Sequence, residues 1–335
     1  MSTNPKVVSG DSLHLPRKEG LTLTVLGCGT LGMAILAGVF ASLCEGKSHS
    51  AYPSESGTAT PSEAVPQAQI PARFIACVRR PESAKRVRDT LGQYPLPLTV
   101  LQNENIKGVE EAQVIILGCK PYMLKDVLDV PGMREALKGK LLISILAGVP
   151  AEQIEDTLYK DSDIPDADRC RVVRAMPNTA AIVRESMTII ATASPPLKPE
   201  WDALISWIFS RIGRVVTLPP SMMDVSTSLG GSGPAFAALV LEAMADGGVA
   251  MGLPRAESQL MAAQVMRGAA GMVLNGEHPA LIREKVSTPG GCTIGGLLVL
   301  EEGRVRGTLA RSVREATVVA SQLGKGIQGV NGTRH

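Results

Sequence analysis

The feature that most constrains the fold of this chain is a glycine-rich segment near its start. Residues 27–32 read GCGTLG, which matches the pattern G-x-G-x-x-G, and they lie between a strand-like run (21–26) and a helical run (33–43). The first glycine of such a turn permits the sharp bend, the second lets a pyrophosphate approach the backbone, and the third allows close packing of the helix on the strand. A glycine-rich turn without a ligand is the alternative interpretation.

Strand-like and helical runs alternate after this turn, which favours the dinucleotide-binding interpretation. Strands are expected at 73–78, 98–101, 114–119, 141–146, 171–176, 187–193 and 215–218, and helices near 81–91, 124–137 and 151–158. Such alternation is typical of parallel βαβ units. From about Met222 onward only helices are expected, near 234–251, 255–274, 279–287, 292–302 and 306–323. The predicted fold class is α/β, with an N-terminal Rossmann-type doubly wound sheet and a C-terminal all-α domain.

Composition shifts divide the chain into segments. Residues 1–20 form an expected disordered tail, 21–195 the dinucleotide-binding domain, 196–220 a connecting segment around one helix, and 221–330 the helical domain. Residues 46–71 are dense in Ser, Pro, Gly and Ala without a periodic apolar face, which predicts an exposed surface insertion. The acidic stretch DSDIPDAD (161–168) is also expected to be a loop.

The charge and residue content exclude several classes of protein. A net charge of +2, with 34 Lys and Arg spread along the chain and 3% aromatic residues, argues against a nucleic-acid-binding protein. The six cysteines form no CxxC pair and the four histidines are dispersed, so no metal is expected and a reducing compartment is indicated. The N-terminal region has no apolar targeting run, which predicts a cytoplasmic protein.

One run is apolar enough to need a membrane check. Residues 233–251 are rich in Ala, Val, Leu and Met, but they include Glu242 and Asp246. We therefore expect a buried helix, in the interior or at an interface, and no association with a membrane.

The end of the second expected strand indicates which dinucleotide is bound. An acidic residue there would accept hydrogen bonds from the ribose 2′-hydroxyl of NAD, whereas this strand ends in Arg79 and Arg80. Two guanidinium groups suit a 2′-phosphate, so NADPH is the predicted cofactor and NADH a second reductant that the enzyme accepts. The alternative is that both arginines are solvated loop charges.

The helical half contains a second glycine-rich loop, STPGGCT (287–293), at the start of an expected helix. Its backbone N–H groups and the hydroxyls of Thr288 and Thr293 suit a small carboxylate, although the spacing alone favours a simple helix cap. No His, Lys or Tyr stands out as a proton donor for carbonyl reduction, and His278 is expected to cap or pack a helix. A basic electrophile such as an imine lowers the need for a strong acid.

Seven motifs in order carry a family resemblance. They are GCGTLG (27–32), GCKP (118–121), SILAGV (144–149), RAMPNTAA (174–181), GGSGPAF (230–236), EAMADGGVAMGLPR (242–255) and HPALIREKVSTPGGCTIGGLLVLE (278–301). Taken together, they resemble pyrroline-5-carboxylate reductase, the NAD(P)H-dependent family that closes proline biosynthesis, over nearly all of 21–325. The resemblance implies hydride transfer to the cyclic imine, and helical domains that interlock in a homodimer, with rings of dimers as a larger assembly.

The resemblance also assigns site residues. Beside Arg79 and Arg80, which the end of the second strand assigns to the cofactor, it implies cofactor binding by Leu26, Gly27, Cys28, Gly29, Thr30, Leu31, Gly32, Asn105, Cys119, Lys120, Pro121, Ala147, Gly148 and Asn178. It implies that Thr288, Gly290, Gly291, Cys292 and Thr293 bind the substrate carboxylate, with the hydroxyl of Thr293 near the imine nitrogen as the catalytic group.

Two departures and two rival functions accompany the resemblance. Gly230 stands where the family usually has a serine close to the nicotinamide, and Cys292 replaces a usual small residue. A β-hydroxyacid dehydrogenase would need a catalytic lysine in the helix after the GGSGPAF motif, and that helix contains none. A non-catalytic NADP-binding regulator would not need a carboxylate-binding loop.

Overall fold

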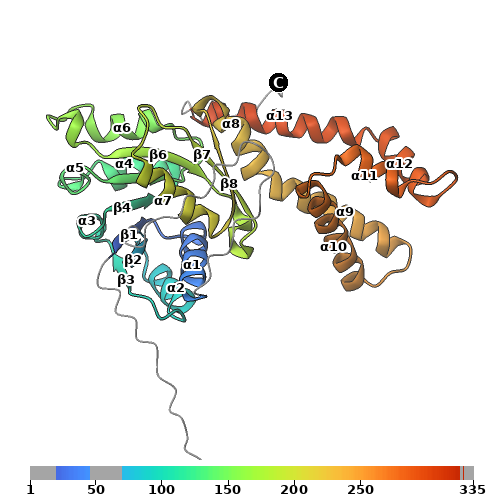
Figure 1. The fold of residues 1–335 in the computed structure, drawn as a ribbon, viewed down its shortest axis with the longest axis horizontal. Coiled ribbons are helices and arrows are strands. Elements are labelled where there is room, and N and C mark those ends of the chain that lie inside the picture. Colours follow the sequence, from blue (N-terminus) through green and yellow to red (C-terminus); the bar gives the residue numbers. More distant parts are fainter. Residues whose placement is uncertain (1–19, 46–69, 325–326, 328–335) are drawn as a thin grey trace, which may run out of the picture.

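The computed structural model describes residues 20–45, 70–324 and 327. The predicted tail (1–20) and insertion (46–71) therefore lie outside the described residues, except for Gly20, Ile70 and Pro71. The described part consists of a sheet with helices on both faces and an all-helical arm that extends away from it (Figure 1).

The sheet has eight strands in the order β3-β2-β1-β4-β5-β6-β7-β8. Their bounds are β1 Leu21–Leu26, β2 Pro71–Val78, β3 Leu98–Gln102, β4 Val114–Leu117, β5 Leu141–Ser144, β6 Arg171–Met176, β7 Ser186–Ala191 and β8 Gly213–Leu218. The first three strands run outward from β1 in one direction and the later ones in the other. This places a topological switch point between β1 and β4, where doubly wound sheets bind ligands.

Helices cover both faces of the sheet, and each face has its own apolar core. One core lies under α1 (Thr30–Cys44), α2 (Pro81–Leu91) and α7 (Pro199–Ser210). The other lies under α3 (Asn105–Glu110), α4 (Leu124–Leu128), α5 (Met133–Ala136) and α6 (Ala151–Tyr159). The central strands are buried on both sides, which explains why their sequences are continuous apolar runs rather than alternating ones.

The structure differs from the sequence prediction in the sheet domain at three places. The single helix expected over 124–137 is broken into α4 and α5, because Pro131 and Gly132 lie between them and Gly132 adopts a positive φ of 87°. Strand β7 is antiparallel to β6, since only a short 3-10 turn (Thr179–Val183) separates them. The segment 196–220 supplies α7 and the edge strand β8 to the sheet, so the helical arm begins close to Pro219.

The arm contains only helical elements, as the sequence predicts. They are α8 (Met223–Ser226), a π-helical turn (Thr227–Gly231), α9 (Gly233–Ala250), α10 (Arg255–Leu274), α11 (Pro279–Val286), α12 (Cys292–Glu302) and α13 (Val305–Gly324). Helices α9 and α10 form a hairpin, and α13 runs back to pack against α8 and the π-helical turn (Figure 1).

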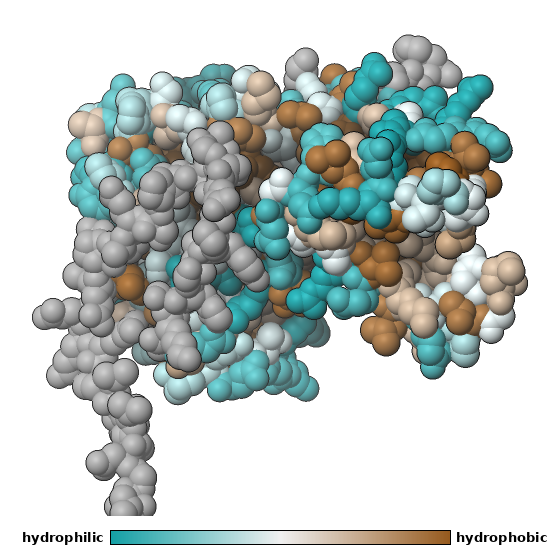
Figure 2. All heavy atoms as spheres, turned by 45° about the vertical axis from the view of Figure 1, so that its right-hand side comes forward, coloured by the Kyte–Doolittle hydropathy of each residue, from teal (hydrophilic) through white to brown (hydrophobic). Residues whose placement is uncertain are grey.

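The expectation that the apolar helix over 233–251 is buried in the interior is wrong for the single chain. In α9 only Ala245 is buried, and Leu239 is 66% exposed. The continuous helical run Pro220–Ala250 is long and apolar enough to cross a membrane by length and composition alone, and little of it is buried. Apolar side chains lie open over the arm, at the right of Figure 2, so an interface explains this composition better than an interior position.

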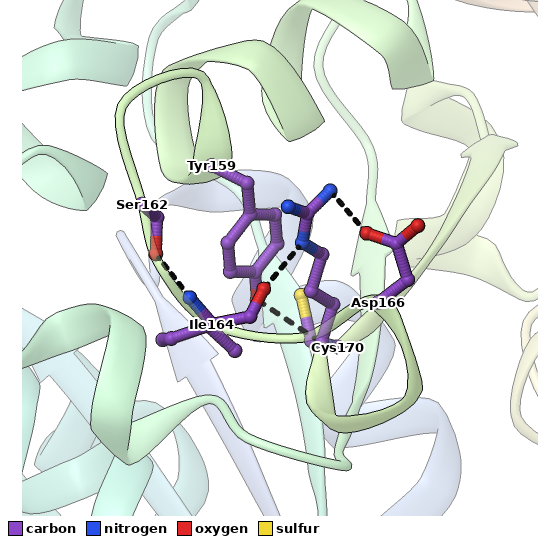
Figure 3. A network of polar contacts seen from close by, with 6 residues as sticks. Tyr159, Ser162, Ile164, Asp166 and Cys170 are labelled. Atoms are coloured by element: carbon purple, nitrogen blue, oxygen red, sulfur yellow. Dashed lines mark hydrogen bonds and ion pairs between the residues drawn. The ribbon is translucent and has the colours of Figure 1, made fainter.

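The acidic stretch 161–168 was expected to be a loop; it connects α6 to β6 but ends in a 3-10 turn, Asp166–Asp168, and polar contacts hold it in place (Figure 3). The hydroxyl of Tyr159 accepts a hydrogen bond from the backbone N–H of Cys170 at 3.0 Å. Arg169 donates to the carbonyl of Ile164 at 3.1 Å and pairs with Asp166 at 2.8 Å. Burial raises the pKa of Tyr159, so this hydroxyl stays neutral at physiological pH.

Candidate functional site

A large cavity of about 1170 Å³ lies at the carboxyl ends of the strands on both sides of the switch point. Its walls come from the turn after β1, the end of β2, the start of α3, and the loops after β4 and β5. This position and size suit an extended ligand such as a dinucleotide.

The glycine turn forms one side of this cavity, and its three glycines have three different surroundings. Gly27 has a φ of +76°, and a Cβ atom there would lie 2.8 Å from the backbone of Cys119. A Cβ on Gly32 would lie 2.9 Å from Val25, so this glycine lets α1 pack closely on β1. A Cβ on Gly29 would meet nothing nearer than 3.9 Å, which leaves open space beside the N-terminus of α1. The N–H groups of Gly27, Cys28 and Gly29 donate to backbone carbonyls, so a phosphate would fit against the N–H groups at the start of α1, which have no intrahelical acceptor.

The corner of the cavity next to the end of β2 is basic. Arg79 and Arg80 follow β2, are exposed, and line the cavity as the sequence predicts. Ser83 and Arg86, on the first turns of α2, line the same corner, and sequence reasoning missed both of them. The signal was available, because residues three and six positions after Arg80 return to the same side of a helix that begins at Pro81.

Most of the other predicted cofactor residues also reach the cavity wall. They are Cys28, Thr30, Leu31, Asn105, Cys119, Lys120, Pro121 and Ala147. Further wall residues that were not predicted include Asn103, Glu104, Tyr122, Thr179 and Ile182. The last two belong to the turn between β6 and β7, whose place beside the cavity depends on the antiparallel pairing that the sequence did not reveal.

Three predicted cofactor residues do not line the cavity. Leu26 is fully buried in β1, and its carbonyl accepts a hydrogen bond from the N–H of Gly118 at 2.8 Å. Gly148 has a positive φ of 72° in the turn before α6. Asn178 is buried, and its side chain forms hydrogen bonds with Ala180 and Gly230.

The cysteine thiols in the cavity wall carry no charge at neutral pH. Burial raises the pKa of Cys28 and of Cys77 to about 12, and that of Cys119 to about 11. A neutral thiol is a small apolar group and a poor nucleophile. The wall near the glycine turn therefore presents no thiolate that would repel a phosphate.

The predicted substrate loop lies on the arm and not in the cavity. Gly290 has a φ of +68°, the N–H of Gly291 donates to the carbonyl of Thr288 at 3.0 Å, and α12 begins at Cys292. A Cβ on Gly291 would come within 2.4 Å of the hydroxyl of Thr288 and 3.1 Å of its carbonyl oxygen, so the bend is tight at this glycine. In Figure 1, α12 lies at the outer end of the arm, away from the strand ends that carry the cavity. A single chain therefore does not bring Thr293 to its own cavity.

The remaining candidate groups have structural surroundings. His278 caps α11, and its Nδ1 accepts a hydrogen bond from the N–H of Ala280 at 3.2 Å, which confirms the capping interpretation. Within the described ranges 20–45 and 70–324, no group of His, Cys, Asp or Glu side chains has an arrangement that could hold a metal ion.

Comparison with known proteins tests whether the sheet domain binds a dinucleotide and whether the helical arm forms dimers. Residues 220–323 match the family model for pyrroline-5-carboxylate reductase dimerisation, and residues 22–148 match the model for NADP oxidoreductase, coenzyme F420-dependent. A doubly wound sheet with a dinucleotide-sized cavity, joined to a helical dimerisation domain, defines a dinucleotide-dependent oxidoreductase.

Relatives define the family more closely. The chain is 61% identical over 321 residues to a pyrroline-5-carboxylate reductase of Lophium arboricola, which covers 95% of this chain and 98% of the relative. It is 54% identical to the enzyme of the same name from Neurospora crassa, with 94% and 97% coverage. The chain belongs to the pyrroline-5-carboxylate reductase family.

Solved structures show the same fold. A pyrroline-5-carboxylate reductase from Coxiella burnetii has a TM-score of 0.71 at 24% identity and covers 91% of this chain and 99% of its own. The NADP-bound pyrroline carboxylate reductase of Plasmodium falciparum has a TM-score of 0.69 at 22% identity, with 91% and 99% coverage. The predicted fold class is thereby confirmed.

Proposed function

We propose that this chain reduces L-1-pyrroline-5-carboxylate to L-proline with NADPH, the last step of proline biosynthesis. The observation that carries the proposal is the combination of the dinucleotide-sized cavity with a dimerisation arm whose glycine loop suits a small carboxylate. Identity of 61% with a reductase of this name over 95% of the chain supports the substrate.

The residues of the cavity fit the cofactor. The open space beside Gly29, at the N-terminus of α1, accepts a pyrophosphate, and Arg79 and Arg80 suit the 2′-phosphate that distinguishes NADPH from NADH. Ser83 and Arg86 add a hydroxyl and a third guanidinium at the same corner. The remaining contacts with the cofactor in this proposal come from Asn105, Lys120, Pro121 and Ala147. NADH is a weaker alternative reductant.

The proposed reaction transfers hydride and a proton to one C=N bond. When bound, NADPH would supply the hydride to the imine carbon, and the proton comes from water, which protonates the nitrogen before the transfer. The N–H groups of Gly290 and Cys292, with the hydroxyl of Thr288, hold the substrate carboxylate, because Pro289 has no N–H and that of Gly291 already donates to the carbonyl of Thr288. The hydroxyl of Thr293 hydrogen-bonds the nitrogen and orients it. Because a protonated imine already accepts hydride readily, Thr293 positions the substrate and need not act as a strong acid.

The active site in this proposal is completed by a second copy of the chain. The loop at 288–293 lies on the arm, the cavity lies in the sheet domain, and the arm exposes apolar side chains such as Leu260 and Val265. Pairing of two arms would cover this surface and bring the loop of one chain to the cavity of the other. We propose a homodimer as the unit of assembly, and a ring of dimers as the larger form.

A cytoplasmic location is part of the proposal. All six cysteines are free thiols, as is usual in a reducing compartment. The balanced charge also gives no reason to expect a nucleic-acid partner.

One assay separates this function from its rivals. Loss of NADPH absorbance should require pyrroline-5-carboxylate, and amino-acid analysis should identify proline as the product. Reduction of NADP⁺ by 3-hydroxyacids would instead indicate a β-hydroxyacid dehydrogenase. Tight NADPH binding without turnover of either substrate would indicate a regulator, and either result would overturn the proposal.

A further inference from the structure

The junction between the sheet domain and the helical arm has a very small apolar core. Its buried residues are Met176, Ile189, Ala191 and Met223, and Met187, Val216 and Leu218 pack against them partly buried. The two large cores of the sheet domain lie elsewhere, on either face of the sheet. Apolar burial alone therefore holds the arm weakly, and polar contacts at the junction decide the angle at which the arm leaves the sheet.

One buried side chain spans this junction. Asn178 follows β6, is 8% exposed, and uses both ends of its amide. Its Oδ1 accepts a hydrogen bond from the N–H of Ala180 at 3.0 Å and caps the 3-10 turn Thr179–Val183. Its Nδ2 donates to the carbonyl of Gly230 at 2.8 Å, in the π-helical turn at the base of the arm.

Each partner of Asn178 belongs to a different part of the proposed active site. The capped 3-10 turn carries Thr179 and Ile182, which line the cavity. The π-helical turn leads directly into α9, and the hydroxyl of Ser228 in this turn donates to the carbonyl of Val313 on α13 at 2.6 Å. Asn178 thus joins the cavity wall to the root of the arm by hydrogen bonds, beside the apolar packing of Met223 on the sheet.

The approach of the π-helical turn to the sheet is close at Gly230. A Cβ atom on Gly230 would lie 2.8 Å from Cδ1 of Ile189 on β7. Glycine at this position therefore lets the backbone carbonyl reach the amide of Asn178 while Ile189 keeps its place in the small junction core.

We infer that Asn178 is a positioning residue that fixes the arm relative to the cavity, and through the arm sets where the substrate loop meets the cofactor. It acts through Gly230 and does not line the cavity, which separates this role from the cofactor contact that the resemblance implied. The kinetic consequence rests on the proposed function, because it needs the loop at 288–293 to close the site of a partner. The structural consequence, which is a loosened π-helical turn in the Asn178 variants, does not depend on the proposed function.

Two substitutions of Asn178 remove its hydrogen bond to the carbonyl of Gly230 and keep its hydrogen bond from the N–H of Ala180. Asn178→Asp and Asn178→Ser both keep an oxygen for the N–H of Ala180, because Asp and Ser are good helix caps. Neither retains the amide donor to Gly230, and N178D also places a second acceptor against that carbonyl. Gln113→Glu is the matched control, since it changes an exposed amide to an acid and keeps the oxygen that accepts from the N–H of Thr22 at 2.8 Å.

Hydrogen exchange gives the readout that is independent of catalysis. In both Asn178 variants, the N–H of Ser232, which donates to the carbonyl of Thr227, should exchange faster, and the capped N–H of Ala180 should stay protected. Kinetics give the second readout: kcat for pyrroline-5-carboxylate should fall roughly 10- to 100-fold, more in N178D than in N178S, because small misplacements of reacting groups have effects of this size. The Kd for NADPH should stay within about twofold of the parent in both variants and in Q113E.

Defined outcomes would overturn the inference. Unchanged exchange at 227–232 in both variants would show that Asn178 does not hold the turn. If the Kd for NADPH rises by the same factor by which kcat/KM falls, Asn178 contributes to cofactor binding and is not a positioning residue. If the parent protein does not reduce pyrroline-5-carboxylate, the proposed function fails, while the exchange experiment still decides whether Asn178 fixes the arm.

A paired variant tests the close approach at Gly230. Gly230→Ala should push the π-helical turn away from Ile189 and reduce kcat as the Asn178 variants do. Combining it with Ile189→Val removes the atom that a Cβ would meet, so the double variant should recover to within about threefold of the parent. Failure of the double variant to recover would contradict the proposed packing.

Discussion

The hydroxyl of Ser258, on α10, donates a hydrogen bond to the backbone carbonyl of Ala245, on α9, at 2.7 Å. Both residues are buried in an arm that otherwise buries few side chains. A Cβ on Gly248 would lie 2.2 Å from the same hydroxyl, so the two helices approach closely on small residues. Because small residues form the inner side of this hairpin, its large apolar side chains remain on the outside.

The outer surface of the hairpin should be a subunit interface. Leu260 is 70% exposed on α10, and Leu260→Asp would place a carboxylate against the partner. We expect the variant to sediment as a monomer where the parent is dimeric, to lose turnover, and to bind NADPH with unchanged Kd. Gln153→Asp makes the same change of charge on the exposed surface of the sheet domain and should leave assembly intact. A dimeric, active L260D would place the interface elsewhere.

The hydroxyl of Thr293 should matter for the substrate and not for the cofactor. Thr293→Ala removes one hydrogen bond to the reacting nitrogen, which should lower kcat/KM for pyrroline-5-carboxylate on the order of 100-fold. Titration of NADPH fluorescence should give the parent Kd. Thr157→Ala removes a hydroxyl that only bonds the carbonyl of Gln153 on α6 and serves as the control. Parent-like kinetics of T293A would remove Thr293 from the mechanism.

The basic corner should discriminate between the two nicotinamide cofactors. Replacing both Arg79 and Arg80 by Ala removes charge-assisted hydrogen bonds to the 2′-phosphate, so the Kd for NADPH should rise on the order of 100-fold while that for NADH changes less than about threefold. Arg73→Ala with Arg88→Ala removes two exposed arginines of β2 and α2 that do not line the cavity, and should alter neither Kd. Equal losses for both nucleotides in R79A/R80A would show that the 2′-phosphate is bound elsewhere.

A stringent test of the sheet edge compares two glycines with positive φ. Gly213 has a φ of 148°, and a Cβ there would lie 2.0 Å from the carbonyl oxygen of Ser186; Gly139 has a φ of 65° and open space around it. Gly139→Ala should cost about 1 kcal/mol of unfolding free energy through backbone strain alone. Gly213→Ala should cost about 3 kcal/mol or more, because β8 must move away from β7. Denaturant unfolding of both variants measures the difference, and equal losses would contradict the contact.

Local signals explain why much of the fold could be predicted. Helix α2 begins at Pro81 as expected, because Pro fixes a helical φ at the first position, and α10 and α12 have the predicted bounds. The break at Gly132 was missed because apolar residues continue with helical spacing on both sides of it. The direction of β7 was missed because strand sequences buried on both faces do not reveal whether pairing is parallel.

Sequence patterns predicted the parts of the candidate site whose residues are close together in the sequence, and missed the parts that depend on contacts between distant residues. The glycine turn and Arg79 lie where one strand–turn–helix unit places them, and the structure finds them in the cavity wall. Asn178 was assigned by resemblance to the cofactor, but its hydrogen bond to Gly230 joins residues 52 positions apart, which no local pattern encodes. The loop at Thr293 meets a cavity only through a second chain in our proposal, so the sequence of one chain cannot place it.

The thiol of Cys119 gives a probe of the cavity that does not depend on catalysis. Burial raises its pKa to about 11, so roughly one molecule in a thousand carries the thiolate at pH 8, and alkylation should accelerate about tenfold for each pH unit up to pH 10. Because Cys119 lines the cavity, bound NADPH should slow this reaction. Cys44 is exposed at the end of α1, outside the cavity, and its labelling should be insensitive to NADPH. Mass spectrometry of the labelled peptides follows both thiols in one sample.

Two results would contradict this expectation. Equal protection of Cys44 and Cys119 would mean that NADPH slows labelling by stabilising the whole fold. If NADPH does not protect Cys119, the nucleotide binds outside the cavity.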